Sequence, residues 1–408
     1  MEEFDKSSLY YVDSTPEGTR YSLYDTASWK NGLAFKNIDF SESGLPVIKI
    51  AELNNGISSS TAYTDKTYSQ DVFLTKGDYV FSWSGNPETS IDIYKYNLPD
   101  GWLNQHIFKV TPKTEIIDKG FFFYLMKFLK PYFKKIATNK QTTGLGHVTI
   151  SDLQRISVAL PPLPTQQKIA AILSSLDDKI ELNNKINTNL EQQTQALFKN
   201  WFVDFEPFGG KMPEGWKVGK LSEIGTIVGG STPSKAKKEY YTNKGIAWIT
   251  PKDLSNDKSK FISHGEIDIT ELGFKNSSAI KMPKGTVLYS SRAPIGYIAI
   301  SKNEVTTNQG FKSVIPNVNV GNGYIYYFLK SNYELIDSLA SGSTFKEISG
   351  SAMKNIPVLV PDEQTLLDFQ SFCFGIFDKQ EKLEEENRKL ASLRESLLPK
   401  LMNGEIGV

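Results

Sequence analysis

The sequence predicts an α+β protein: two mixed α/β globular domains separated by two long helices that form an antiparallel coiled coil with pseudo-two-fold symmetry. Three observations predict it. The 408-residue chain repeats itself at a spacing near 200 residues, each half contains short β-rich runs between Gly, Asn, Ser and Pro clusters, and each half ends in a long heptad run. Two copies are too few for a solenoid, so the repeat indicates a tandem duplication.

Matching residues follow in the same order along the two halves. The matched sets are Lys76-Gly77 with Lys284-Gly285, Asn104-Gln105 with Asn308-Gln309, residues 120–127 with 323–330, and Ser151, Ile156 and Pro161 with Ser351, Ile356 and Pro361. The offset varies within the globular parts, as loop insertions would produce. Side chains shared by both halves are expected to form the framework, and side chains that differ at matched places are expected to carry any difference in function.

The globular domains are expected over residues 1–160 and 206–360. Their strands are expected to be short and to include residues 46–53, 78–82, 246–250 and 286–290. A helix is expected in each domain, over residues 121–135 and 324–339. The elements are therefore mixed within each domain.

Long helices are expected within residues 161–205 and 361–408, as a central and a C-terminal spacer. Prolines before Thr165 block backward extension of the first helix, and Thr165 can act as its N-cap. Apolar positions alternate four and three residues apart, which is the pattern of a coiled-coil seam. The predicted seam residues are Ile169, Leu173, Leu176, Ile180, Asn187, Leu190 and Leu197 in the first helix, and Phe369, Ile376, Leu383, Asn387, Leu390 and Leu397 in the second.

Symmetry favours antiparallel pairing of the two helices within one chain. A two-fold axis perpendicular to an antiparallel pair exchanges the helices and places one domain at each end. The alternative, in which each amphipathic helix lies on its own domain, stays open, although the matched length and register of the helices argue against it. Two similar domains related by a two-fold axis suit a target of approximate two-fold symmetry, of which the duplex DNA backbone is the most common.

The sequence offers no catalytic constellation and no metal site. The chain has 3 His and 1 Cys, Cys373, too few for a zinc cluster or an internal disulfide, and it lacks the Gly-x-x-x-x-Gly-Lys-Ser/Thr pattern of a nucleotide-triphosphate site. The paired carboxylates Asp177-Asp178 and Glu384-Glu385-Glu386 are expected to be solvated helix faces. The polar N-terminus and the absence of a run of about 18 apolar residues predict a cytoplasmic protein.

The net charge of zero, 46 basic against 46 acidic side chains, is the sum of unlike parts. Residues 206–360 carry 19 basic and 13 acidic side chains, whereas residues 361–408 carry 6 and 10. A basic bias is thus present in one globular domain, and overall neutrality does not argue against nucleic-acid binding by that domain.

Several motifs resemble the specificity subunits of Type I restriction-modification enzymes. Residues 228–235 (VGGSTPSK), which follow the MPEGW run at 212–216, resemble the opening of a target recognition domain of that family. Residues 160–167 (LPPLPTQQ), and the two ends of the second long helix, resemble its conserved helical regions. The order of domain, helix, domain and helix covers essentially the whole chain. Residues 31–36 (NGLAFK) depart from the pattern, which suggests that the two domains belong to different subtypes.

The resemblance implies a subunit without catalytic activity. Each domain would read one half of a split double-stranded DNA sequence, and the helices would set the unspecified gap between the halves. Two modification (methyltransferase) subunits would dock beside the helices and use S-adenosylmethionine, and restriction (endonuclease and translocase) subunits would use ATP and Mg. This chain would itself bind no cofactor and no membrane.

Residues that differ between the halves are the candidates for DNA contact. Arg292 is the clearest guanine-reading candidate, because a guanidinium can span O6 and N7, with an ordinary surface salt bridge as the alternative. Lys235, Lys237 and Lys238 suit phosphate contacts, with a solvated loop as the alternative. The polar loops at 140–143 and 341–346 suit a groove-facing loop, with a plain surface turn as an equal alternative. The candidates are Trp83, Ser84, Asn86, Lys140, Gln141 and Thr143 in the first half, and Ser231, Thr232, Lys235, Lys237, Lys238, Ser291, Arg292, Ser343, Thr344 and Lys346 in the second.

The shared Asn104-Gln105 and Asn308-Gln309 are expected to form a structural turn instead of reading bases. Two other classes of function stay open on the sequence alone. One is a coiled-coil scaffold that carries two non-DNA binding modules. The other is a nuclease or methyltransferase that acts alone, which the lack of an active-site set disfavours.

Overall fold

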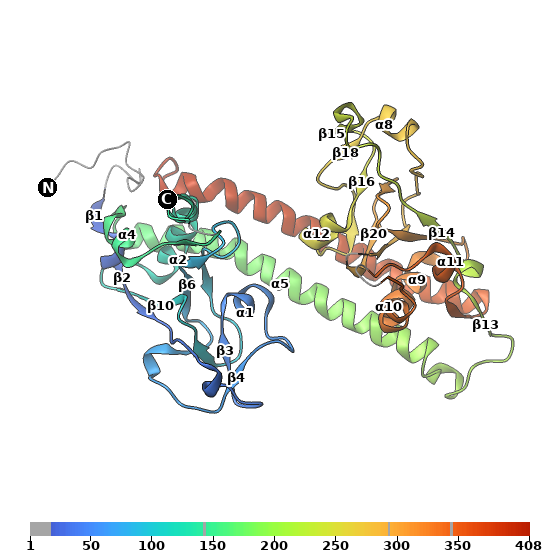
Figure 1. Ribbon diagram of the computed structural model, residues 1–408, viewed down its shortest axis with the longest axis horizontal. Helices are drawn as coiled ribbons and strands as arrows, with labels where there is room; N and C mark the ends of the chain where they lie inside the picture. The colour runs from blue at the N-terminus through green and yellow to red at the C-terminus, as the bar shows by residue number, and fades with distance from the viewer. Residues whose placement is uncertain (1–17, 142–143, 293, 343–345) are drawn as a thin grey trace. The chain divides into compact units, whose positions relative to one another are not determined.

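The computed structural model describes residues 18–141, 144–292, 294–342 and 346–408, and the chain divides into two compact units (Figure 1). Unit 1 comprises Met1–Ile180 and Lys389–Val408, and unit 2 comprises Glu181–Arg388. The long helices α5 (Leu163–Phe202) and α12 (Glu363–Met402) each contribute one part to each unit. Each unit therefore joins one globular domain, called domain 1 or domain 2 below, to a segment of both long helices.

Domain 1 is built on a four-stranded antiparallel sheet. Its strand order is β2 (Ala27–Asn31), β10 (Ile107–Pro112), β6 (Tyr79–Ser82) and β8 (Asp92–Lys95). The buried side chains of this sheet share one core with helices α2 (Lys119–Phe128) and α3 (Lys130–Asn139). A smaller sheet has the order β4 (Tyr63–Thr64), β3 (Leu45–Ile48), β9 (Gly101–Leu103) and β5 (Phe73–Leu74), with β3 parallel to β9.

Domain 2 is built on a five-stranded sheet. Its order is β14 (Gly225–Gly229), β22 (Lys312–Pro316), β19 (Val287–Ser291), β20 (Ile295–Ser301) and β17 (Phe261–Ile262). Helices α9 (Gly321–Ser331) and α10 (Tyr333–Ser338) share a core with this sheet, and a parallel pair joins β16 (Trp248–Ile249) to β21 (Thr306–Thr307).

Shorter elements complete the two domains. In domain 1 these are β1 (Thr19–Ser22), α1 (Ile50–Asn55), β7 (Ser84–Gly85), β11 (Gly146–His147), α4 (Ile150–Arg155) and β12 (Ser157–Leu160). In domain 2 they are β13 (Lys217–Lys220), α6 (Leu221–Ile224), β15 (Tyr241–Thr242), α7 (Pro251–Asn256), β18 (Asp268–Ile269), α8 (Glu271–Lys275), α11 (Gly350–Lys354) and β23 (Pro357–Val360).

The two domains have the same mixed α/β architecture, as the repeat predicts. The strand order β2-β10-β6-β8 of domain 1 corresponds to β14-β22-β19-β20 of domain 2, and the parallel pair β3·β9 corresponds to β16·β21. Strand β17, which runs parallel to β20 at the edge of the sheet, has no counterpart in the described part of domain 1. Domain 2 therefore carries an added edge strand on a shared framework.

Two of the expected strands are shorter than the sequence suggested. Strands β3 and β16 stop after the apolar residues, and helices α1 and α7 follow them directly. In α7 the carboxylate of Asp253 accepts a hydrogen bond from the backbone N–H of Thr250 (2.7 Å), so a capping box turns the chain into a helix. Glu52 does the same for Lys49 at α1 (3.0 Å).

The helix expected in each domain is in fact two helices. In domain 1 Pro131 lies in the first turn of α3, where its missing N–H prevents a continuous helix from α2. In domain 2 the break falls at Asn332, whose side-chain amide donates to the carbonyl of Phe328 (2.9 Å) and so satisfies the end of α9.

The first long helix begins three residues earlier than expected, because Thr165 as N-cap would make Gln166 the first helical residue. Helix α5 starts at Leu163, so Thr165 lies within the first turn and is not the N-cap. A proline is tolerated there because the first N–H groups of a helix have no intrahelical partner. At the start of α12, the side chain of Asp362 accepts from the backbone N–H of Thr365 (2.9 Å). It also accepts from the indole N–H of Trp216 (2.8 Å), which fastens the helix start to domain 2.

Within each unit the two long helices run antiparallel. In unit 1, Asp177 of α5 pairs with Arg394 of α12. In unit 2 the amide of Asn183 donates to Asn387 (2.9 Å) and the ring of Phe198 lies 6.0 Å from that of Phe369, so residue numbers rise along one helix as they fall along the other. Each predicted seam residue is buried or half-buried.

Candidate nucleic-acid interface

Domain 2 contains a cleft of about 680 Å³ where several of the sequence candidates meet. Its walls come from the loop after β14, the start of α7, the end of β19 and the turn after β21. The lining residues are Thr232, Lys235, Lys238, Tyr241, Trp248, Thr250, Pro251, Lys252, Asp253, Glu266, Ile267, Arg292, Asn308, Gln309 and Gly310. Four of them, Thr232, Lys235, Lys238 and Arg292, were singled out from the sequence as DNA contacts.

A close backbone approach holds one wall of the cleft in place. A Cβ atom on Gly230 would overlap the carbonyl oxygen of Asn308, so only glycine fits there. The next residue, Ser231, donates its backbone N–H to the carbonyl of Thr307 (2.8 Å), and the Thr232 hydroxyl hydrogen-bonds the Gln309 side chain. The loop is thereby fixed against the turn that carries Asn308 and Gln309.

The same construction occurs in domain 1. A Cβ atom on Gly32 would overlap the carbonyl oxygen of Asn104. The backbone N–H of Asn104 donates to Ile48 (3.0 Å), as that of Asn308 donates to Ile249 (3.0 Å). These bonds support the interpretation of the shared Asn-Gln pairs as structural turns.

Arg292 lies at the cleft in an ion pair with Glu347 (3.4 Å). The same carboxylate contacts Lys312 (3.2 Å), so Glu347 keeps a cationic partner if Arg292 turns away. The Arg292 side chain is 34% exposed, and ion pairs at such exposure contribute only about 0 to 1 kcal/mol. A guanine edge could therefore compete with Glu347 for the guanidinium.

The cleft lysines differ in how they are held. Lys235 and Lys238 are exposed, and in the part of the chain that the structure describes neither has a carboxylate partner. Lys252, which the sequence reasoning missed, is paired with Glu266 (2.6 Å). Lys237 lies over the ring of Tyr240 (5.3 Å) and does not line the cleft. Lys235 and Lys238 are thus the cations most readily offered to phosphate.

Two aromatic residues that the sequence reasoning also missed, Trp248 and Tyr241, line the cleft beside the apolar side chains of Pro251 and Ile267. The indole N–H of Trp248 donates to Ser231 (3.0 Å), and its ring meets that of Tyr241 edge-on at 5.7 Å. The Tyr241 hydroxyl donates to the carbonyl of Pro233 (2.5 Å), and burial raises the pKa of Tyr241, so this hydroxyl stays protonated. Trp248 could have been suspected, since it begins the β16 counterpart of β3.

The first three candidates of domain 1 lie around β7. Trp83 stacks on Phe108 (5.6 Å) and donates its indole N–H to Asn31 (3.0 Å). Ser84 is only 5% exposed and hydrogen-bonds His147 (2.9 Å), so direct contact with DNA would require this site to open. Asn86 is exposed and accepts from the backbone N–H of Glu88 (2.9 Å), as a turn residue does.

The loop candidates before the last helix of each domain are only partly described. Lys140 forms an ion pair with Asp152, and Lys346 with Asp337 (2.9 Å), so each ammonium group has a carboxylate partner. Gln141 is exposed. Thr143, Ser343 and Thr344 lie outside the described residues.

Ser291, a sequence candidate for DNA contact, does not reach the surface in this structure. Its side chain is completely buried at the end of β19. Strand β19 is central in the sheet, and all five of its residues are buried, because both faces of a central strand are covered. Ser231, by contrast, is half-buried, and its hydroxyl accepts from that of Ser278 (3.0 Å).

The described residues do not assemble a metal site. Among them, no three His, Cys, Asp or Glu side chains lie together as metal ligands would. Cys373 is buried, which raises the pKa of its thiol to about 12, so a reactive thiolate is disfavoured. None of the helices in the described ranges has the length and apolar character to span a membrane. The cleft offers cations, amides and aromatic faces, which suit a polyanion.

Comparisons with known proteins agree with this architecture. The family model described as "Type I restriction modification DNA specificity domain" matches twice, at residues 19–192 and 213–392. The Type I restriction enzyme HindI specificity subunit of Haemophilus influenzae is 29% identical, over 82% of this chain and 87% of that protein. The MjaIX specificity subunit of Methanocaldococcus jannaschii is 42% identical over 197 residues, which are 47% of this chain and 45% of that protein.

A solved structure shares the fold. The crystal structure of the S subunit of a Type I restriction-modification system from M. genitalium aligns with a TM-score of 0.57 at 18% identity. The alignment covers 95% of this chain and 96% of that one. The likeness therefore extends over both domains and both long helices.

Proposed function

We propose that each globular domain reads one half of a two-part duplex DNA target, on the premise that this chain belongs to the Type I restriction modification DNA specificity family and is a specificity subunit of such a system. One observation carries the proposal. The family domain occurs twice, and each copy has the same framework with different surface loops. Two different readers in one chain suit a target with two different half-sites.

Domain 2 would bind its half-site through the cleft. Lys235 and Lys238 would contact phosphates and so place the domain on the duplex, while Arg292 would read a base edge in the major groove. The paired long helices would set the number of unread base pairs between the half-sites. Each helix has 40 residues and is therefore about 60 Å long.

Chemistry would be supplied by partner subunits. Two modification subunits would bind S-adenosylmethionine and methylate the DNA, and restriction subunits would use ATP and Mg to translocate and cleave it. What supports this part of the proposal is the family membership. The chain itself would only recognise DNA and hold the partners.

Selection from a random duplex library tests the proposal. The full chain, together with the modification subunits of its own system, is incubated with the library, and the bound duplexes are sequenced. We expect one sequence made of two specified blocks separated by a gap of constant length. Enrichment of a single block, or of none, would contradict reading by two domains and would favour a scaffold whose modules bind something other than DNA.

A further inference from the structure

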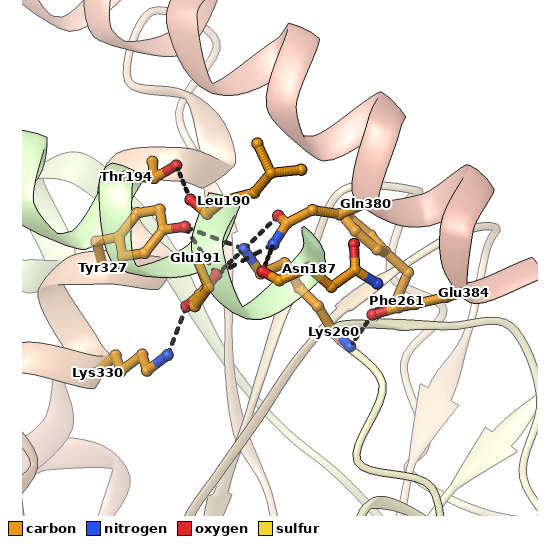
Figure 2. A network of polar contacts seen from close by, with 10 residues as sticks. All are labelled: Asn187, Leu190, Glu191, Thr194, Lys260, Phe261, Tyr327, Lys330, Gln380 and Glu384. Carbon is orange, nitrogen blue, oxygen red and sulfur yellow. Dashed lines mark hydrogen bonds and ion pairs between the residues drawn. The ribbon is translucent and has the colours of Figure 1, made fainter. Parts of the chain in front are cut away.

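A lysine is buried where domain 2 meets the long helices of unit 2. Lys260 is 7% exposed and directly precedes the added edge strand β17. Figure 2 shows its ammonium group among side chains of α5, α9 and α12. Burial of a charge is costly unless that charge is paired and hydrogen-bonded, so the contacts of Lys260 need an explanation.

The Lys260 ammonium has a partner on each of the three helices. It forms an ion pair with Glu191 of α5, donates to Gln380 of α12 (2.8 Å) and donates to the hydroxyl of Tyr327 of α9 (3.0 Å). It also lies over the rings of Tyr326 and Phe377, at 4.8 and 4.4 Å from their centroids. One side chain of domain 2 thus touches both long helices at once.

The partners are themselves held. Glu191 accepts from the Tyr327 hydroxyl (3.0 Å) and pairs with Lys330, and the amide of Gln380 donates to the carbonyl of Asn187 on the other long helix (3.2 Å). Burial alone would raise the pKa of Glu191, but the ammonium groups of Lys260 and Lys330 outweigh it and lower that pKa. Burial lowers the pKa of Lys260, and the Glu191 carboxylate opposes this effect.

The backbone beside Lys260 is also tied to α12. The carboxylate of Glu384 accepts from the N–H groups of Lys260 (2.8 Å) and Phe261 (3.3 Å). Lys302, at the end of β20, pairs with Glu381 (3.2 Å) and Glu385. The three glutamates expected to form a solvated helix face, Glu384, Glu385 and Glu386, are half-buried, which corrects that expectation. Glu384 and Glu385 bind the edge of the domain 2 sheet, whereas Glu386 accepts from the side-chain amide of Asn183 on α5 (2.8 Å).

Among the described residues of domain 1, no buried ammonium lies at the matched place. Tyr124, which the repeat aligns with Tyr327, donates its hydroxyl to Asp177 of α5 (2.7 Å). Asp177 in turn pairs with Arg394 of α12, and both of these side chains are about one-third exposed. Asp177 is thus not simply solvated. At this matched place, the link in unit 1 is a tyrosine hydroxyl and a partly exposed ion pair.

Such a network specifies geometry more than it adds stability. Replacing a buried ion pair by apolar side chains is often neutral for stability, whereas buried polar groups can fix register because only one arrangement satisfies them all. The Lys260 contacts are satisfied only when domain 2, α5 and α12 hold one relative placement. A shift of one base pair along DNA corresponds to about 3.4 Å, enough to break every one of these bonds.

We infer that Lys260 is a positioning residue, which fixes domain 2 in one orientation on the paired helices and thereby makes the subunit selective for one gap length between its half-sites. The inference rests on the proposed function, since gap length has meaning only for a two-part target. It assigns to Lys260 no contact with DNA. Its loss should relax the gap while leaving both half-site sequences as they are.

The test measures gap preference directly. Duplexes that carry the two selected half-sites at gaps shorter, equal and longer than the selected one compete for the full chain in complex with its modification subunits. We expect Lys260→Met to reduce the preference for the selected gap over its neighbours by about tenfold, which equals about 1.4 kcal/mol. Lys260→Arg, which keeps the charge and the donors, should restore most of the preference.

Lys127→Met is the matched control. Lys127 is also a half-buried lysine, which pairs with Asp92 (2.9 Å) and lies over the ring of Phe123 (5.4 Å), but these partners belong to domain 1 alone. Its loss should lower stability without changing the gap. Equal relaxation in Lys127→Met and Lys260→Met would mean general loosening and would overturn the inference.

A second variant covers the case in which Lys260→Met does not fold. Lys302→Met removes a partly exposed member of the same attachment and should relax the gap by a smaller factor. If the folded variants keep the wild-type gap preference, Lys260 is not a positioning residue. If the wild-type complex selects no two-part sequence at all, the proposed function itself fails, an outcome visible before any variant is made.

Discussion

In unit 2 the domain is attached to the long helices through a buried ammonium, that of Lys260, whereas in unit 1 the matched attachment uses the Tyr124 hydroxyl and a partly exposed ion pair. The two attachments descend from one duplicated framework. The difference arises from the added strand β17, which places Lys260 beside α12. The two domains thus share a framework and differ in one edge strand, which brings a buried charge to the long helices only in unit 2.

The candidate DNA-contact residues also differ between the two domains. In domain 2 the cations Lys235 and Lys238 stand exposed at a cleft, whereas in domain 1 Lys140 is held by the buried carboxylate of Asp152 and Trp83 is stacked against the sheet. The turns that support the loops are the same in both. The two domains therefore share the turns that support these loops and differ in the side chains that the loops expose.

The largest effect is expected from breaking the shared framework. Gly230→Ala should destabilise unit 2 by about 3 kcal/mol, because the new methyl group would overlap the backbone carbonyl of Asn308. Urea unfolding measures the loss. Gly229→Ala is the control, since its Cβ would meet no atom within 4 Å. Gly32→Ala should cost unit 1 a similar amount, and a much smaller cost there would show that the two turns are not equivalent.

The next effect concerns base reading in domain 2. Arg292→Ala should relax the preference at one base position by about 1 to 3 kcal/mol, because a bidentate contact to guanine is lost. Sequencing of the duplexes selected by the variant checks this. Arg388→Ala removes an exposed arginine outside the cleft and should leave the recognised sequence unchanged. An unaltered sequence with Arg292→Ala would leave that residue as a surface ion-pair partner of Glu347.

A smaller effect, independent of sequence, is expected from the cleft lysines. Replacing Lys235 and Lys238 by Ala should weaken binding to all duplexes and reduce the slope of log K against log salt by about 2, because two phosphate contacts are lost. Binding titrations at several salt concentrations measure the slope. Replacing the exposed Lys258 and Lys275, which do not line the cleft, should change it less. Equal slopes for the two double variants would show that the cleft lysines do not contact DNA phosphates.

The last effect is a pH dependence confined to unit 2. Burial raises the pKa of Glu384 to about 7 from an ordinary value of 4.5, so between these values the folded state binds more protons than the unfolded state. The contribution of this carboxyl to stability therefore falls as pH rises through that window. Urea unfolding at several pH values should show a flatter profile for Glu384→Gln than for the wild type. Parallel profiles would mean that Glu384 titrates normally.

Much of the architecture was readable from residue patterns. Spacings of four and three residues predicted the two long helices and their seam, because helical periodicity is a local property of the chain. The repeat along the chain predicted two domains of one architecture. Helix boundaries and the short strands were less accurate, since a single cap such as Asp253 or a single Pro131 decides whether a strand or helix continues.

The long-range polar contacts that distinguish the two halves could not be predicted from residue patterns. Lys260 was not singled out, Ser291 and Ser84 were placed at the surface, and the glutamates at 384–386 were expected to be solvated. The bond between Lys260 and Gln380 joins residues 120 positions apart, and that between Arg292 and Glu347 joins residues 55 apart. Periodicity shows which face of a helix or strand is apolar. Which charged side chains contact that element depends on packing between segments that are distant in the sequence. Burial and ion pairing then determine whether a charged side chain is free to bind DNA.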